Sequence, residues 1–309
     1  MDGKTLTRML AEVLNENPDT SGLASEGSRN SYDYLWQAAV EFNNRTQFLH
    51  TYQEITTVAD QQSYVLNADF QKLFAKDDLK NFFIKYTDDD DVVSTIYYRH
   101  QEDILMGGET DSVAVPAYFC IRDRELTTAT RTGVASATGS VSAGQTTLTD
   151  ATTPATFVTC DIQPGDTIHN TSDCSTGYVL SVTSETVLVC SLFDGTDNFF
   201  TDTEGYVIVH QPRLEIYFEQ PTETASETVT VQYVQRPLPV YSDYGTYRFP
   251  SQYGAALCRY AAWIMKYRDK EPATGDSWYS YFDRMVNQAN MVSRGTFNRR
   301  GFSVQMKKR

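Results

Sequence analysis

The sequence predicts an α+β protein. Its expected parts are a helical body of N-terminal and C-terminal amphipathic helices with antiparallel β hairpins, an inserted small all-β domain, and an extended C-terminal arm. Three observations predict this class: apolar residues recur at helical spacing near both ends, residues 125–210 break into short Thr-, Ser- and Val-rich pieces, and the last residues carry only basic charge. The predicted boundaries are 1–124 and 211–295 for the body, 125–210 for the inserted module and 296–309 for the arm.

Two helices are expected near the N-terminus. Apolar residues recur at i, i+3, i+4, i+7 and i+8 in the first, which are Leu6, Met9, Leu10, Val13 and Leu14. This helix should end near Asn17, because a residue that precedes proline disfavours the helical conformation. The second helix is expected from about Ser31 to Gln47, with Ser31 as its N-cap.

Strands and turns follow the second helix. "ITTVADQQSYVLNADF" from Ile55 predicts a hairpin, and "LKNFFIKYTDDDDVVSTIYYRH" predicts strand, acidic turn and strand with Asp88 to Asp91 at the tip. These four aspartates lack the D-x-D-x-D-G spacing of a calcium loop, so a solvated turn is favoured over a calcium site. "AYFCIRD" predicts another strand, and "RLEIYFEQPTETASETVTVQYVQRPLPV" predicts a further hairpin.

The inserted module is expected to consist of short strands joined by turns. The candidate strands are "QTTLTD", "FVTCDI", "DTIHN", "TGYVLSVTS", "ETVLVC" and "GYVIVH". Turn-forming residues separate them, for example at Pro164-Gly165-Asp166 and Asp194-Gly195-Thr196. Because the module lies between strands of the body, we expect it to be inserted at a surface loop.

Two more helices are expected near the C-terminus. The first begins at Pro250 and carries apolar residues to Tyr267, and residues 271–275 interrupt it. The second runs from about Asp276 to Ser293 and ends at Gly295.

Motifs for catalysis or cofactor binding are missing from the sequence. The four histidines have no second ligand nearby, no CxxC pair exists, and neither G-x-S-x-G nor G-x-G-x-x-G occurs. We therefore predict a protein that is not an enzyme, with no catalytic, cofactor-binding or metal-binding residue and no cofactor. No apolar run has the length of a membrane span and the N-terminus has no apolar signal segment, so we expect no membrane partner and synthesis in a cytoplasm.

Charge is distributed unevenly along the chain. The net charge is −14, but residues 284–309 contain seven basic and no acidic side chains. The first 283 residues therefore carry 19 basic and 40 acidic side chains, a balance of −21. Such an acidic surface weakens binding to phosphate backbones, and it also aids solubility; the sequence does not choose between these two roles.

The order of these segments resembles a family of bacteriophage proteins. The helix "YLWQAAVEFNNRTQF" is followed by "TTVADQQSYVLNADF", then by "PAYFCIRDRELT", Arg236-Pro237, and a helix start at Pro250, Tyr253 and Ala256. This pattern is similar to the head-to-tail adaptor (head-completion or connector) proteins of tailed bacteriophages, related to the tail-tube gatekeepers of short-tailed phages. Asp60 and Asn67 stand where that family usually has glycine and proline. The resemblance covers about 1–124 and 211–295 and leaves out the inserted module.

The resemblance implies a structural virion protein, made in the host bacterial cytoplasm and located in the neck between capsid and tail. It would form a homo-oligomeric ring, about twelvefold, between the portal protein above and tail-tube or nozzle proteins below. Duplex DNA would pass through without specific binding. The alternatives are a tail-tube or nozzle gatekeeper and, from a different class, a virion-attached carbohydrate-binding or glycan-cleaving protein.

The basic C-terminal arm is the predicted portal-binding segment, by analogy with the C-terminal segments of that family. Binding to nucleic acid or membrane, or a solvated end without a partner, are the alternatives. The predicted portal-binding residues are Arg294, Phe297, Arg299, Arg300, Phe302, Val304, Met306, Lys307, Lys308 and Arg309.

Overall fold

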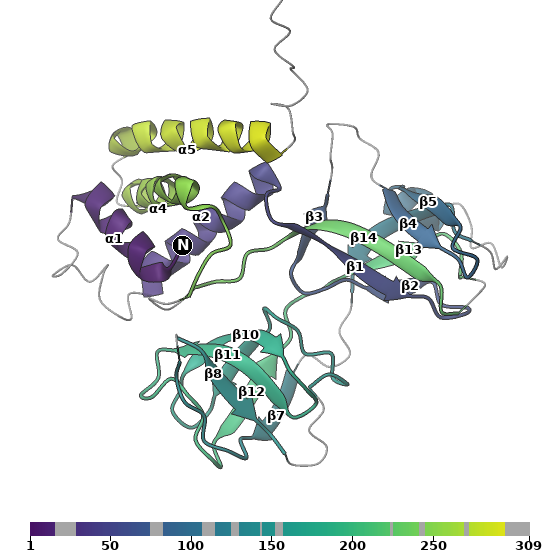
Figure 1. Cartoon of the computed structure of the whole chain (residues 1–309), viewed down its shortest axis with the longest axis horizontal. Coiled ribbons are helices and arrows are strands. Elements are labelled where there is room, and N and C mark those ends of the chain that lie inside the picture. Colours follow the sequence, from purple (N-terminus) through teal and green to yellow (C-terminus); the bar gives the residue numbers. More distant parts are fainter. Residues whose placement is uncertain are drawn as a thin grey trace, which may run out of the picture.

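Two large curled β-sheets, rather than a helical body with small hairpins, dominate the architecture of the described protein (Figure 1). The computed structural model describes residues 1–15, 29–74, 83–106, 115–124, 130–142, 144–151, 157–222, 225–240, 245–268 and 272–293. Within these ranges it contains 14 strands. The predicted helical body with small hairpins is therefore wrong, since most of the expected hairpin strands join into one sheet.

The four predicted helices are present and form one layer of the molecule, but two begin earlier than predicted. They are α1 (Gly3–Leu14), α2 (Arg29–Thr46), α4 (Gly254–Arg268), which follows the short 3₁₀ helix η1 (Ser251–Tyr253), and α5 (Pro272–Ser293). The second begins before Ser31, its expected N-cap, and the last already includes residues 272–275, which were expected to interrupt the helices. Asp2 caps α1, because its side chain accepts a hydrogen bond from the backbone N–H of Thr5 at 2.7 Å. Asn15 ends α1 in the left-handed conformation, with φ of 57°.

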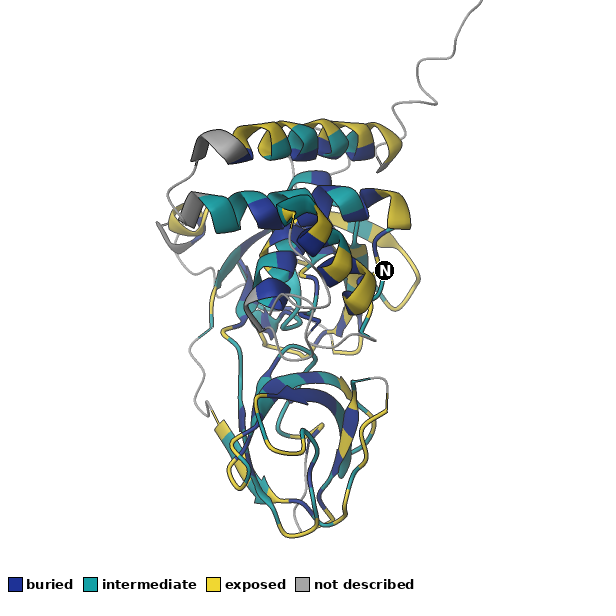
Figure 2. Ribbon diagram, turned by 90° about the vertical axis from the view of Figure 1, so that its left-hand side faces the viewer, coloured by how far each residue is buried: buried dark blue, intermediate teal, exposed yellow. Residues whose placement is uncertain are grey.

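The helices bury their apolar stripes against one another. Phe42 of α2 lies at the centre, with its ring centroid 5.1 Å from that of Tyr253 and 5.4 Å from that of Phe249. Figure 2 shows the buried positions of the helices facing inward and the exposed positions of α5 facing away from its neighbours. An ion pair between Arg45 of α2 and Asp283 joins α2 to α5.

An eight-stranded sheet forms the second part of the molecule. Its strands are β1 (His50–Thr56), β2 (Ser63–Val65), β3 (Phe70–Leu73), β4 (Phe83–Thr87), β5 (Val93–Tyr98), β6 (Tyr118–Asp123), β13 (Leu214–Phe218) and β14 (Thr228–Gln235). They are arranged in the order β1-β14-β4-β5-β6-β13-β2, and β3 pairs with the end of β14 beyond β4. Among the described strands only β5 and β6 pair in parallel, and the crossover between them contains the unpredicted helix α3 (Gln101–Met106).

Two of the predicted hairpins are wrong because other strands separate their partners. β1 and β2 pair with β14 and β13 respectively, so they lie at opposite edges of the sheet. β4, β5 and β6 lie between β13 and β14. The sheet then curls until its edges meet, where the Gln53 side chain donates to Val65 O at 3.0 Å and accepts from Asn67 N at 2.9 Å.

The β4–β5 hairpin was predicted correctly, and its acidic tip is a turn. The Asp88 side chain accepts hydrogen bonds from the backbone N–H groups of Asp90 at 3.1 Å and Val92 at 2.8 Å. Asp91 adopts a left-handed conformation, with φ of 61°. Across the described ranges, no group of three or more His, Cys, Asp or Glu side chains is placed to hold a metal ion.

A six-stranded sheet forms the third part, below the other two in Figure 1. Its strands are β7 (Thr130–Val134), β8 (Thr146–Thr149), β9 (Thr167–Asn170), β10 (Thr176–Val182), β11 (Val187–Phe193) and β12 (Gly205–Val209), in the order β7-β12-β9-β10-β11-β8. The sheet surrounds its own buried cluster, which includes Leu148, Ile168 and Tyr206. "FVTCDI" is a series of turns rather than the predicted strand, because Asp161 has a positive φ of 57° while Phe157 is buried.

A buried charge cluster fixes this six-stranded part to the eight-stranded sheet. Arg213, just before β13, forms ion pairs with Asp161 and with Asp166, the latter at 3.0 Å, and both the Arg213 and Asp166 side chains are almost fully buried. The Nδ1 atom of His210 lies 3.1 Å from the Asp166 carboxylate. Arg124 N also donates to Arg213 O at 3.1 Å, so the chain leaves and re-enters the eight-stranded sheet at one place.

Candidate functional site

The predicted portal-binding residues, Arg294 to Arg309, lie outside the described residues. Their role therefore stays a prediction. The structure instead reveals a cleft and an exposed sheet face, which are assembled from parts of the chain that are far apart in the sequence.

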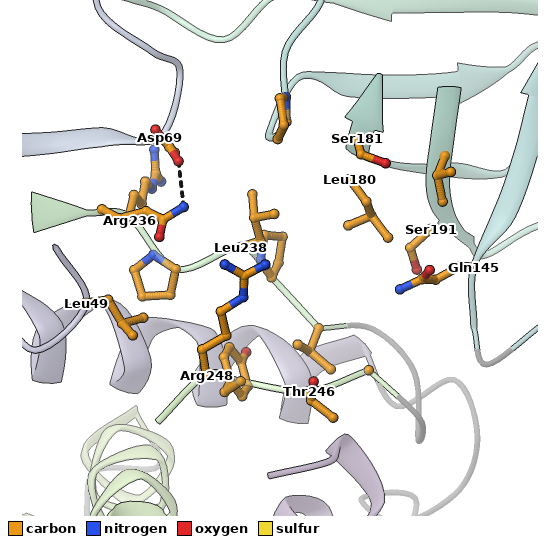
Figure 3. Close-up of a pocket in the computed structure, with 18 of the residues that line it drawn as sticks. Leu49, Asp69, Gln145, Leu180, Ser181, Ser191, Arg236, Leu238, Thr246 and Arg248 are labelled. Carbon is orange, nitrogen blue, oxygen red and sulfur yellow. Dashed lines mark hydrogen bonds between the residues drawn. The ribbon is translucent and has the colours of Figure 1, made fainter. Parts of the chain in front are cut away.

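The cleft lies between the segment that leaves β14 and the six-stranded sheet (Figure 3). It has a volume of about 490 Å³. One wall is formed by the segment after β14, including Arg236, Leu238 and Arg248, and the facing wall includes Leu180 and Ser181 of β10. We call this space the arginine cleft.

Two prolines shape the wall that carries the arginines. Pro237 and Pro239 follow the last strand residue, Gln235, and have no backbone N–H to continue strand pairing. The indole N–H of Trp36 in α2 donates to Pro237 O at 2.8 Å and fixes the segment against the helices. The segment is thereby held open toward the six-stranded sheet.

Asp69 anchors the start of this wall. Its carboxylate accepts hydrogen bonds from the Tyr233 hydroxyl and from the Gln235 side chain, each at 2.7 Å, and its backbone O accepts from Arg236 N at 2.6 Å. Burial raises the pKa of Tyr233 well above its ordinary value, so its hydroxyl stays protonated and donates. Both oxygens of Asp69 are thus already engaged within the wall.

The cleft has an excess of positive charge. Arg236 and Arg248 are exposed, and within the described part of the chain neither forms an ion pair; the Arg236 guanidinium lies 4.9 Å from the ring centroid of Trp36. On the facing wall, Ser191 Oγ donates to Gly144 O at 2.8 Å, and Gln145 and Ser181 add polar atoms without charge. Two guanidinium groups beside apolar and neutral polar surface suit a carboxylate-bearing ligand.

The outer face of the eight-stranded sheet is the second feature. Residues 52, 54, 85, 93, 95 and 97 alternate with buried residues, so their side chains point away from the sheet core. Tyr52 is 60% exposed, Val93 57% and Tyr97 49%. A polar row crosses four neighbouring strands on the same face. Its paired members are Glu54, Thr230, Lys85 and Thr95.

Sequence reasoning missed the cleft because its walls are about fifty residues or more apart in the chain. One local signal could have indicated it: Arg236 and Arg248 flank a proline-containing segment in an otherwise acidic protein. The run of basic residues near the C-terminus instead predicts that the functional cations lie in the C-terminal arm.

No protein-family model matches the chain, and no curated protein matches its sequence. In the described ranges, no helix is both long and apolar enough to cross a bilayer.

Proposed function

We propose that this protein is a structural virion component that forms a ring between the portal and the tail, around the passage for DNA. The observation that carries the proposal is the outer face of the eight-stranded sheet, where Tyr52, Val93 and Tyr97 are about half exposed or more. Aromatic and apolar side chains gathered on one sheet face are typical of contact surfaces between subunits. The order of sequence segments, which resembles head-to-tail adaptors, supports the same assignment.

The charge of the chain supports a passage that does not retain DNA. Residues 1–283 carry 19 basic and 40 acidic side chains. Affinity for duplex DNA rises with each phosphate that a basic side chain neutralises, so an acidic wall lets DNA slide past. The predicted portal contact remains the basic segment from Arg294 to Arg309.

Electron microscopy of the purified protein, of the protein mixed with portal, and of virions tests the proposal. The expected result is a closed ring on the portal axis, and localisation at the far end of the tail would instead indicate a gatekeeper. A peripheral fibre, or a protein that stays monomeric under all three conditions, would contradict the proposal.

A truncation tests the portal contact. Removing residues 296–309 should leave folding unchanged, because the buried helical core ends at Ala289 among the described residues. Portal binding, measured by co-sedimentation, should be lost. Full binding by the truncated protein would assign the portal contact to another surface.

A further inference from the structure

An acidic turn and the arginine cleft lie at opposite ends of one strand. The turn begins after Thr87, which pairs with Thr228, the first residue of β14. The last residue of β14, Gln235, leads directly into the cleft wall at Arg236. At about 3.3 Å per residue, β14 separates the two features by roughly 23 Å. The turn of one copy therefore cannot reach the cleft of the same copy.

The turn is a preformed acidic ligand with an apolar edge. Asp89, Asp90 and Asp91 are exposed, and Val92 and Val93 beside them are each 57% exposed. The two backbone hydrogen bonds to the Asp88 side chain hold the turn in one shape. A preordered loop loses little conformational entropy on binding.

The arginine cleft has the complementary chemistry. Arg236 and Arg248 supply guanidinium groups that can bind carboxylates bidentately, while Leu238 and Leu180 supply apolar surface. The cleft's own carboxylate, Asp69, already accepts hydrogen bonds at both oxygens. The chain's basic C-terminal segment has the same sign of charge as the cleft and is a poor occupant.

We infer that the acidic turn of one copy docks in the arginine cleft of the next copy. The inference rests on the proposed ring function and identifies one of the contacts that build the ring. Turn and cleft are different surfaces, so each docked copy leaves one turn and one cleft available, and the contact repeats until a ring closes. The exposed Val93 lies on the outer face, which extends this contact beyond the turn.

Two charge-reversal variants test the contact. The first carries Asp89→Lys and Asp90→Lys in the turn, and the second carries Arg236→Glu and Arg248→Glu in the cleft. Each variant alone would face like charges across every contact, so self-association should fall about a hundredfold. Their equimolar mixture should regain assembly, because the reversed turn then meets the reversed cleft and the native turn meets the native cleft.

Sedimentation velocity and electron microscopy would measure assembly of each variant and of the mixture. Asp197→Lys with Asp202→Lys is the matched control, since it reverses two exposed aspartates in the six-stranded part and should assemble like the unaltered protein. Recovery in the mixture also shows that both variants are folded.

Four results would overturn the inference. Unaltered assembly by either charge-reversal variant would leave the ring intact and remove this contact from it. A mixture that stays dissociated would show that turn and cleft do not meet, and loss of portal binding alone by the cleft variant would assign the cleft to a partner protein. An unaltered protein that forms no ring, alone or on portals, would remove the proposed function together with the contact.

Discussion

Arg213 is a buried residue that joins the six-stranded part to the eight-stranded sheet. Its guanidinium is 1% exposed and binds Asp166, which is fully buried. Asp166 also accepts hydrogen bonds from the backbone N–H groups of Gln163 at 2.9 Å and Gln211 at 3.0 Å. The buried pair of Arg213 and Asp166 stabilises the fold only while both members are present. If one is removed, the other is left as a buried charge without a partner, and water cannot reach it to solvate it.

We therefore expect Asp166→Ala to lower the free energy of unfolding by about 3–5 kcal/mol. Chemical denaturation would measure this loss. Glu12→Ala is the control, since it removes an exposed ion pair with Arg8 on α1 and should change stability by only about 0.5 kcal/mol. A loss below about 1 kcal/mol for Asp166→Ala would show that the cluster does not hold the two parts together.

The buried Tyr206 side chain should make the free energy of unfolding depend on pH in the alkaline range. Burial and the hydrogen bond that its hydroxyl donates to Asp150 at 2.6 Å raise its pKa well above the ordinary value of about 10. Below pH 10 the folded and unfolded states both keep the proton, and stability is independent of this group. Above about pH 10 the unfolded state loses the proton first, so stability falls by up to about 1.4 kcal/mol per pH unit.

In the variant Tyr206→Phe, the free energy of unfolding should fall less steeply with pH, because one ionising group is removed. Denaturation at pH values from 9 to about 11.5 would measure this slope. Tyr52→Phe is the control, because it makes the same substitution at a side chain that is 60% exposed. Parallel slopes for Tyr206→Phe and the unaltered protein would mean that Tyr206 ionises equally in both states.

At the scale of elements, Gln53 holds the edges of the eight-stranded sheet together. Its side chain forms hydrogen bonds with Val65 O and Asn67 N. These two backbone groups have no strand partner where the edge strands β1 and β2 meet. Gln53→Ala should cost about 1–3 kcal/mol and speed amide exchange at Asn67. Gln232→Ala, on the exposed outer side of β14, should do neither. Unchanged exchange at Asn67 would show that the seam is closed by other contacts.

The sequence predicted elements well and their pairing poorly. The stripe from Leu6 to Leu14 and the alternation around Asp88 are local patterns, so the helices and the β4–β5 hairpin were found. Strand partners depend on contacts between distant residues, such as Ile55 with Val229, and no local pattern encodes them. The arginine cleft was missed for the same reason, because Arg236 and Ser181 meet only after folding.

At the scale of the whole molecule, the described residues form one large buried cluster in each of the three parts and a small fourth cluster of Ile104, Cys120 and Tyr217 beside α3. Because the chain leaves and re-enters at Arg124 and Arg213, we expect residues 125–210 to be replaceable by a short Gly-Ser linker. The remaining protein should keep its helical circular dichroism and a cooperative thermal transition. Aggregation or loss of the helical signal would show that the six-stranded part is required for folding of the rest.

The adjacency of Arg124 and Arg213 also determines how the protein responds to mechanical force. A force applied to the six-stranded part is transmitted to the eight-stranded sheet at one end of the paired strands β6 and β13, where Asp123 lies opposite Leu214. Hydrogen bonds loaded from one end break one after another, so this geometry resists tension weakly. The ion pairs of Arg213 with Asp161 and Asp166 lie ahead of the first strand pair and bear that load before it. We expect these ion pairs to raise the force needed to separate the six-stranded part from the sheet.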